Sequence, residues 1–147
     1  MVGRGERLVK AAELGHETVD YSVTDPVTTV RAMTDGIGPD VALDCAGVPD
    51  SYRWALAMLH KGGRCASVGI PVEDVLLSLQ ELVLYEKELV GVRATAGGMR
   101  RAMPLVSDGR IRVNELHTHT FPLDEFREAI DTFNERRDGA LKVIIEP

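Results

Sequence analysis

Apolar residues along the chain follow two alternating patterns. Short, continuously apolar segments alternate with longer segments in which apolar side chains recur every three or four positions. The continuous segments predict buried strands, and the periodic segments predict helices with one buried face. Strands are predicted at 17–21, 40–45, 64–68, 89–92 and 141–145, after a strand end at Met1 and Val2.

Helices are predicted between these strands from capping residues and apolar spacing. Asp25 and Pro26 suit the N-cap and the first helical position. Helices are expected at 6–14, from 26 to about 34, from 49 to the glycines at 62 and 63, at 99–108 and at 121–133. The third is expected to bury Tyr52, Ala55, Leu56 and Leu59, and the last has Phe126, Ala129, Ile130 and Phe133 at helical spacing. A further apolar helical rhythm at 76–84 is expected to pack in the core.

This order of elements predicts the fold class. Continuously apolar strands that alternate with helices are typical of an α/β doubly wound fold, a parallel sheet covered on both faces. Ligands of such sheets bind beyond the carboxyl ends of the strands. The segments there are 45–47, 68–71 and 92–95, and two of them contain a glycine. These glycines either allow a ligand to approach the backbone or simply turn the chain.

The composition is that of an ordinary folded domain. The chain has 147 residues, 44% hydrophobic and 27% charged, enough for about one domain with a core. A net charge of −6 argues against a nucleic-acid partner, and no apolar run reaches the ~20 residues of a membrane span. Cys45 and Cys65 offer neither a disulfide framework nor zinc-ligand spacing, so a cytoplasmic location is expected.

Few residues suggest a catalytic or metal site by themselves. His117 and His119 share a face if they lie on a strand, but no carboxylate or cysteine completes a zinc-ligand set, so a turn leading into Phe121 is favoured. Asp44, at a strand end, could act as a general base, cap a neighbouring loop or contact a cofactor hydroxyl. No G-x-S-x-G motif and no Cys-His pair indicates a covalent nucleophile.

Four segments together carry a family resemblance. They read DVALDCAG, LHKGGRCASVGIP, ELVGVRA and FPLDEFREAIDTFNERRDGALKVIIEP. In this order they resemble the zinc-type medium-chain alcohol dehydrogenases of the threonine and sorbitol dehydrogenase branch. The resemblance implies an oxidoreductase that transfers hydride between an alcohol or polyol and NAD or NADP. It also implies an incomplete Rossmann domain at 1–115 and a closing segment of the catalytic domain at 116–147.

The resemblance implies a cofactor-binding role for particular positions. Segment 45–47 would lie against the adenosine half, segment 68–70 under the nicotinamide, and backbone groups of segment 92–94 would bind the carboxamide, while Lys142 would meet the pyrophosphate. The implied cofactor-binding residues are Gly3, Arg4, Cys45, Ala46, Gly47, Val68, Gly69, Ile70, Val92, Arg93, Ala94 and Lys142.

The choice between NAD and NADP depends on the first residues. In the family, the second Rossmann strand ends in an acidic residue when the cofactor is NAD. Here the matching place reads Val2-Gly3-Arg4, which leaves room for a 2′-phosphate and offers it a cation. This favours NADP, with an exposed turn as the alternative role of Arg4.

Some features of the family have no counterpart in this sequence. The ligands of the catalytic zinc, the Gly-x-Gly-x-x-Gly turn and the first Rossmann strand are absent. The chain is therefore expected to be a fragment: a truncated reading frame, a proteolytic product or a designed piece. It has no catalytic residue of its own and is expected to be inactive alone. The family's strand order is expected to leave an unpaired edge on segment 17–21 and another on 40–45, which either pair with each other or accept another chain.

The sequence leaves two further hypotheses on function open. The exposed parallel edge at 89–92 predicts at least a dimer, so the chain could be a non-catalytic self-associating module or half of a split enzyme. A methyltransferase that binds S-adenosylmethionine is the third hypothesis, because a KGG motif before an apolar strand also occurs in that class.

Overall fold

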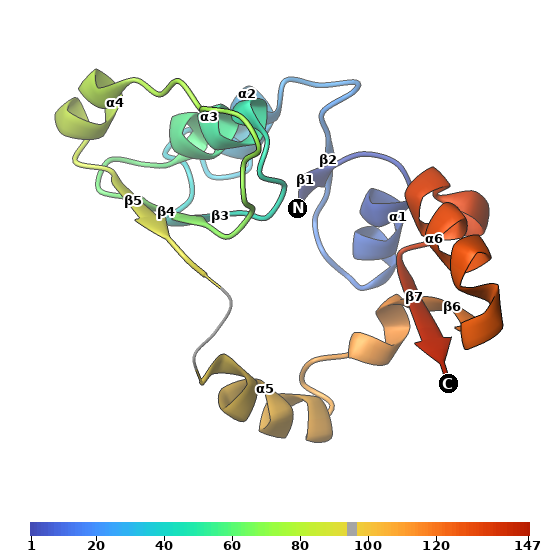
Figure 1. Cartoon of the computed structure of the whole chain (residues 1–147). Helices are drawn as coiled ribbons and strands as arrows, with labels where there is room; N and C mark the ends of the chain where they lie inside the picture. The colour runs from blue at the N-terminus through green and yellow to red at the C-terminus, as the bar shows by residue number, and fades with distance from the viewer. Residues whose placement is uncertain (94–96) are drawn as a thin grey trace. The chain divides into compact units, whose positions relative to one another are not determined.

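The computed structural model describes residues 1–93 and 97–147 (Figure 1). The chain divides into two compact units. The first unit contains residues 1–4 and 11–93, and the second contains 5–10 and the described residues from Gly97 to Pro147. Helix α1 (Glu6–Glu13) has residues in both units.

The strands of the first unit form two parallel sheets. β1 (Val2–Gly3) pairs with β2 (Val19–Asp20), and β3 (Val41–Asp44), β4 (Arg64–Ser67) and β5 (Glu88–Gly91) form a second sheet in this order. Parallel strands that alternate with helices confirm the predicted α/β class, although the strands are divided among small sheets.

Helix α3 (Pro49–Met58) covers one face of the three-stranded sheet and forms the core of the first unit (Figure 1). The register places Ala42, Cys65 and Leu89 side by side. Side chains of α3 and of the residue that follows it pack on this row. The buried cluster consists of Ala42, Ala55, Leu56, Leu59 and Cys65. The predicted apolar face of this helix is therefore confirmed, and α2 (Pro26–Ala32) packs beside it.

The opposite face of the three-stranded sheet differs from the expectation of a sheet covered on both faces. Val41 is 55% exposed and Leu43 is 67% exposed. Side chains alternate between the faces of a strand, so these two point away from the buried Ala42. The prediction of two covered faces is wrong for β3, because α3 packs on one side only.

Helix α4 (Leu79–Leu84) also departs from its predicted burial. Only Leu77 and Leu82 of segment 76–84 pack against the core cluster. Leu79 is 73% exposed and Val83 is 75% exposed. The predicted helical rhythm is confirmed by this helix, whereas core packing is confirmed for Leu77 and Leu82 and is wrong for Leu79 and Val83.

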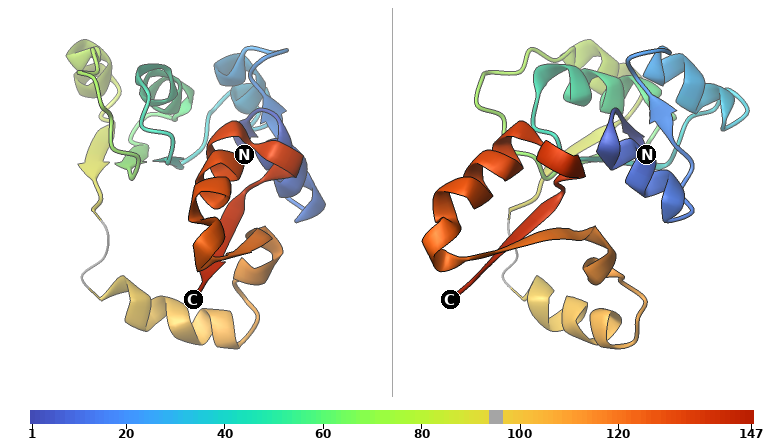
Figure 2. Two further views of the ribbon diagram at one scale, coloured as in Figure 1. Left: turned by 45° about the vertical axis from the view of Figure 1, so that its right-hand side comes forward. Right: turned by 90° about the vertical axis from the view of Figure 1, so that its right-hand side faces the viewer.

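The second unit contains a short parallel pair and its helices. Strands β6 (His117–Pro122) and β7 (Lys142–Glu146) pair in parallel, and α6 (Phe126–Glu135) lies along them in both views of Figure 2. Helix α5 (Gly98–Ser107) precedes this pair. Three short 3₁₀ helices complete the unit, at Val113–Leu116, Leu123–Glu125 and Arg137–Gly139.

The predicted start of the last helix is wrong. Residues 117–122 are a strand, where a turn was favoured, and the helix begins at Phe126 rather than at Phe121. Threonines at 118 and 120 alternate with His119 and Phe121, a composition that suits a strand. The side chains of Phe126, Ile130 and Phe133 are exposed, whereas Ala129 is buried.

The two segments that were expected to have unpaired edges do not pair with each other in the described residues. β2 pairs with β1, and β3 pairs with β4. Direct pairing of the segments at 17–21 and 40–45, one of the two predicted outcomes, is therefore not what the structure shows. None of the described helices is long and apolar enough to cross a membrane.

Candidate functional site

Three predicted cofactor segments of the first unit lie at one edge of the three-stranded sheet. In register, Asp44, Ser67 and Gly91 are neighbours at the carboxyl ends of β3, β4 and β5. Asp44 O accepts from the backbone N–H of both Val68 and Gly69 at 2.8 Å, and Val92 N donates to Ser67 O at 2.8 Å. Segments 45–47, 68–70 and 92–93 therefore follow one another along this edge, as the fold class predicts for a ligand site.

Gly47 and Gly69 allow two of these segments to touch through their backbones. A Cβ added at Gly69 would lie 2.3 Å from Gly47 N. A Cβ added at Gly47, which has a φ of +68°, would lie 2.8 Å from Ile70 O. No side chain fits at either distance, so both glycines are required by the contact between segments 45–47 and 68–70.

Buried polar side chains hold this contact in place. Asp44 is 3% exposed, and its Oδ2 accepts from Gly47 N at 3.0 Å. Tyr52 is 4% exposed, and its Oη donates to Gly69 O at 2.6 Å. The carboxylate of Asp44 therefore caps the neighbouring loop, which is one of its three predicted roles. The role of Tyr52 was not predicted, because an apolar helix position in the sequence does not reveal where a hydroxyl group will point.

The two cysteine thiols differ in accessibility. Cys65 is fully buried, and burial raises the pKa of its thiol, with a smaller contribution from the negative charge of Asp44. Cys45 is exposed in the predicted adenosine segment. A buried thiol with a raised pKa is unreactive, so Cys65 acts as an apolar core residue.

An aromatic and cationic cluster lies where β1 and β2 end. The guanidinium of Arg4 stands 5.6 Å from the ring centroid of Tyr21. Tyr21 in turn packs against Trp54 of α3, with 5.2 Å between ring centroids. Stacking of this kind holds a guanidinium in one orientation while leaving its N–H groups available. Neither Tyr21 nor Trp54 was predicted as part of a site.

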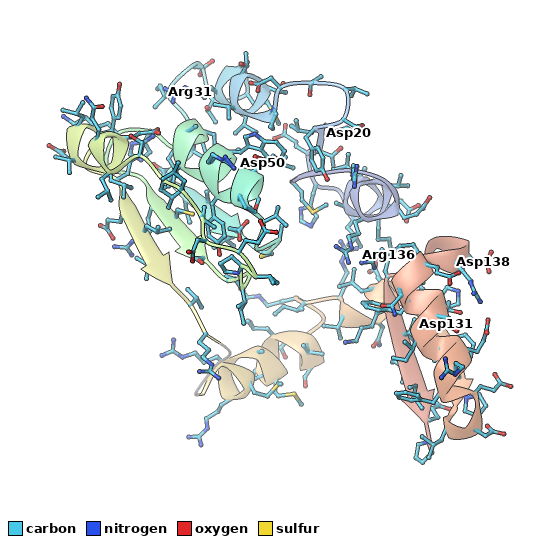
Figure 3. All side chains as sticks on the ribbon, turned by 45° about the horizontal axis from the view of Figure 1, so that its top comes forward. Asp20, Arg31, Asp50, Asp131, Arg136 and Asp138 are labelled. Atoms are coloured by element: carbon cyan, nitrogen blue, oxygen red, sulfur yellow. The ribbon has the colours of Figure 1, made fainter. Side chains whose placement is uncertain are left out.

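Asp20, labelled in Figure 3, lies beside this cluster. Its Oδ1 accepts from Ser22 Oγ at 2.6 Å and from Ser22 N at 2.8 Å. These hydrogen bonds lower the pKa of Asp20. The hydroxyl group of Ser22 has the largest effect, its backbone N–H comes next, and the positive charge of Arg4 acts in the same direction. Ser22 thus fixes the carboxylate in a local turn.

Two further predicted cofactor residues are Lys142 and Ala94. Lys142 is the first residue of β7 in the second unit, and its side chain is exposed. Ala94 lies outside the described residues. The cofactor roles of both remain predictions, as do those of the other proposed positions.

The zinc ion that the family resemblance implies is expected only in a domain that this sequence does not contain, and the described residues offer no site for it. They contain no group of three His, Cys, Asp or Glu side chains that could hold a metal. The Nε2 atom of His117 lies 2.8 Å from Thr120 Oγ1 and 3.0 Å from His119 O, and the ring of His119 stacks on Phe121.

Comparison with known proteins finds relatives that are dehydrogenases. The zinc-binding dehydrogenase family matches residues 1–108. An alcohol dehydrogenase of Cupriavidus necator is 29% identical over 99% of this chain and 41% of its own length. An L-threonine 3-dehydrogenase of Bacillus subtilis is 30% identical over 96% of this chain and 41% of its own length. The chain therefore spans about two fifths of the length of these relatives.

Solved structures agree with the sequence relatives. The 2R,3R-butanediol dehydrogenase of Bacillus subtilis superimposes with a TM-score of 0.89 at 27% identity, over 99% of this chain and 42% of that one. A short chain alcohol dehydrogenase from E. coli CFT073, complexed with NADH, has a TM-score of 0.88 at 26% identity, over 99% and 43%. A zinc-binding dehydrogenase from Sinorhizobium meliloti, bound to NADP, has a TM-score of 0.86 at 25% identity, over 99% and 44%.

These matches extend over nearly the whole chain, and they confirm the resemblance that its four segments carry. With its parallel α/β sheets and its glycine-bearing strand ends, this chain belongs to the zinc-binding dehydrogenase family.

Proposed function

We propose that this chain is part of the coenzyme domain of an NAD(P)-dependent alcohol or polyol dehydrogenase, with residues 116–147 closing the catalytic domain. The observation that carries this proposal is the edge formed by segments 45–47, 68–70 and 92–93, where Gly47 and Gly69 pack backbone to backbone. Related structures are complexed with NADH or NADP. The reaction of the whole enzyme is then hydride transfer between a secondary alcohol and the nicotinamide ring.

The cluster around Arg4 supports a preference for NADP. A 2′-phosphate carries negative charge and several acceptor oxygens, and a guanidinium recognises it through charge-assisted hydrogen bonds. Stacking on Tyr21 presents the Arg4 guanidinium at the end of β1, next to the small Gly3. The carboxylate of Asp20 is already engaged by Ser22, which reduces its competition for Arg4.

The chain alone is proposed to bind its cofactor weakly and to lack dehydrogenase activity. A glycine-rich turn that is absent here provides about two charge-assisted hydrogen bonds to the pyrophosphate, worth roughly 3–6 kcal/mol together. That loss weakens binding by roughly a hundredfold to ten-thousandfold, from micromolar to millimolar or weaker. A chain that supplies the turn and the intervening strand would restore affinity.

A non-catalytic, self-associating module is the second candidate function. Strand β5 pairs only with β4 among the described residues, and its Val90 is exposed. A free parallel edge of this kind favours pairing with another strand, so a dimer or a higher oligomer is proposed for either candidate. The free thiols of Cys45 and Cys65 are consistent with a proposed cytoplasmic location.

Calorimetric titration separates these candidates. The chain is titrated in parallel with NADPH, NADH and S-adenosylmethionine, and light scattering gives its mass at the same concentration. Binding of NADPH that is tighter than that of NADH supports the coenzyme-domain proposal. Binding of S-adenosylmethionine without either nicotinamide cofactor contradicts it, and an oligomer that binds none of the three supports the self-associating module.

The variant Arg4→Ala tests the cofactor preference directly. Loss of a charge-assisted hydrogen bond is expected to weaken NADPH binding by roughly tenfold or more and to leave NADH binding unchanged. Arg53→Ala is the matched control, because Arg53 is an exposed arginine on α3 that pairs with Asp50 outside the cluster. Equal weakening of NADPH and NADH binding by Arg4→Ala would contradict a role at the 2′-phosphate.

A further inference from the structure

A cavity of about 310 Å³ opens within the first unit beside the carboxyl ends of β4 and β5. It is lined by Tyr52 of α3, Ser67 of β4, Leu89 of β5 and the loop that runs from Pro71 to Leu77. The hollow is open to solvent on the side of the loop, where Pro71, Val72, Glu73 and Asp74 are exposed, so it suits a small ligand that is only partly enclosed.

The hydroxyl groups at this cavity have a defined direction of donation. Tyr52 has one hydroxyl proton, which it donates to Gly69 O at 2.6 Å, because a carbonyl oxygen can only accept. Tyr52 Oη also lies 2.6 Å from Ser67 Oγ. Ser67 must therefore donate its own proton to Tyr52, and the remaining lone pairs of Ser67 Oγ can only accept a hydrogen bond.

Besides the acceptor Ser67 Oγ, the cavity has negatively charged side chains at its rim. Glu73 and Asp74, both exposed, stand in the lining loop, and none of the described lining residues is basic. The remaining lining side chains are apolar, with Leu77 and Leu89 among them. The cavity thus combines apolar walls, an inner acceptor and two carboxylates, a combination that favours a cationic donor and disfavours an anion.

We propose that this cavity binds a small organic ammonium ion that carries a short apolar group. The ammonium group donates to Ser67 Oγ and faces the carboxylates of Glu73 and Asp74, while the apolar group lies against Leu77 and Leu89. This site adjoins the proposed cofactor edge through Tyr52 and Ser67, and it lies on the α3 side of β4. Successive side chains of an extended strand point to opposite faces, so Ser67 faces the α3 side and Val68 the other side. The inference therefore does not rest on the proposed function.

A nuclear magnetic resonance titration with benzylammonium tests the proposal. The ¹⁵N-labelled chain is titrated with benzylammonium chloride, and separately with benzoate, which has the same ring and the opposite charge. Saturable shifts are expected at the amides of Ser67, Leu77 and Leu89, with a dissociation constant on the order of 1 mM. Benzoate is expected to bind at least about tenfold more weakly. No saturation with benzylammonium, or equal binding of benzoate, would overturn the proposal.

Variants distinguish this arrangement from a nonspecific apolar contact. Ser67→Ala removes the inner acceptor and is expected to weaken benzylammonium binding by roughly threefold to tenfold. The double variant Glu73→Gln with Asp74→Asn is expected to weaken benzylammonium binding by about threefold or more. It should also remove most of the salt dependence of that binding. Glu17→Gln with Asp35→Asn makes the same change of net charge away from the cavity and is expected to have no effect. Unchanged binding by both cavity variants would overturn the proposal.

Discussion

The two compact units contrast in the way their helices use an apolar stripe. In the first unit, α3 packs its stripe on the sheet, and Leu59 and Cys65 are fully buried there. In the second unit, α6 has an apolar stripe at the same helical spacing, yet Phe126 is 52% exposed and Phe133 is 38% exposed. The buried residues of the α6 helix are Ala129 and Thr132.

This difference shows what an amphipathic pattern does and does not specify. The spacing of apolar residues defines a stripe on a helix, but a partner surface decides whether that stripe is buried. Helix α3 has its partner within the first unit. Phe126 and Phe133 of α6 have no comparable cover among the described residues.

Truncation of the first unit's core is expected to give the largest effect on stability. Leu59→Ala removes a side chain that is 1% exposed and should lower the free energy of unfolding by about 2–5 kcal/mol. Leu79→Ala, at a position that is 73% exposed, should change it by less than about 0.5 kcal/mol. Urea unfolding followed by Trp54 fluorescence measures both. Similar losses in the two variants would contradict the assigned core.

Substitution at the contact between segments 45–47 and 68–70 should give the next largest effect on stability. Gly69→Ala places a Cβ 2.3 Å from Gly47 N and should destabilise the first unit by about 1–3 kcal/mol. Gly91→Ala is the matched control, because nothing lies within 4 Å of a Cβ added there. The same unfolding experiment applies, and a neutral Gly69→Ala would show that the segments are not packed as described.

Unfolding monitored by two probes should reveal a smaller effect, a difference in stability between the two units. Trp54 is the only tryptophan of the chain and lies in the first unit, whereas far-ultraviolet circular dichroism reports on helices of both units. The second unit buries fewer apolar side chains, so the circular dichroism curve should begin to fall before the Trp54 fluorescence changes. Coincident curves would indicate a single cooperative unit.

The smallest expected effect is the pH dependence at the N-cap of α2. Hydrogen bonds that Thr28 donates to the Asp25 carboxylate, first from its side-chain hydroxyl and then from its backbone N–H, lower the pKa of Asp25 below the ordinary value of 3.8. A lowered folded-state pKa stabilises the fold above the unfolded-state value, and this contribution disappears as the pH falls through the folded-state value. Asp25→Asn keeps a capping side chain and should flatten this acid dependence of the melting temperature slightly. If the melting temperature of the variant depends on acid pH as that of the original chain does, Asp25 does not contribute to this dependence.

Much of the fold follows from the sequence, because the order of elements is a local property. The strands that end at Asp44, Ser67 and Gly91 were predicted within a residue or two, and so were the segments that follow them. Burial was predicted less well, since Leu79 and Phe126 lie in apolar patterns but have no cover in the structure. A pattern along one segment contains no information on what packs against it.

The polar contacts of the candidate site could not be predicted from spacing. Tyr52 stands in the sequence as one more apolar helix residue, and only the approach of α3 to β4 places its hydroxyl beside Gly69. The stacking of Arg4 on Tyr21 likewise joins residues that are far apart in the sequence. Contacts of this kind depend on the assembled fold.

A nuclear magnetic resonance titration of the ¹⁵N-labelled chain with NADPH tests the central claim most directly. The proposed cofactor edge predicts saturable shifts that are concentrated at the amides of Arg4, Gly47 and Gly69. A loss of about 3–6 kcal/mol in binding free energy places these shifts at millimolar concentrations of NADPH. Shifts that are absent at these amides, or that are scattered evenly over both units, would contradict the assignment of this edge as the coenzyme site.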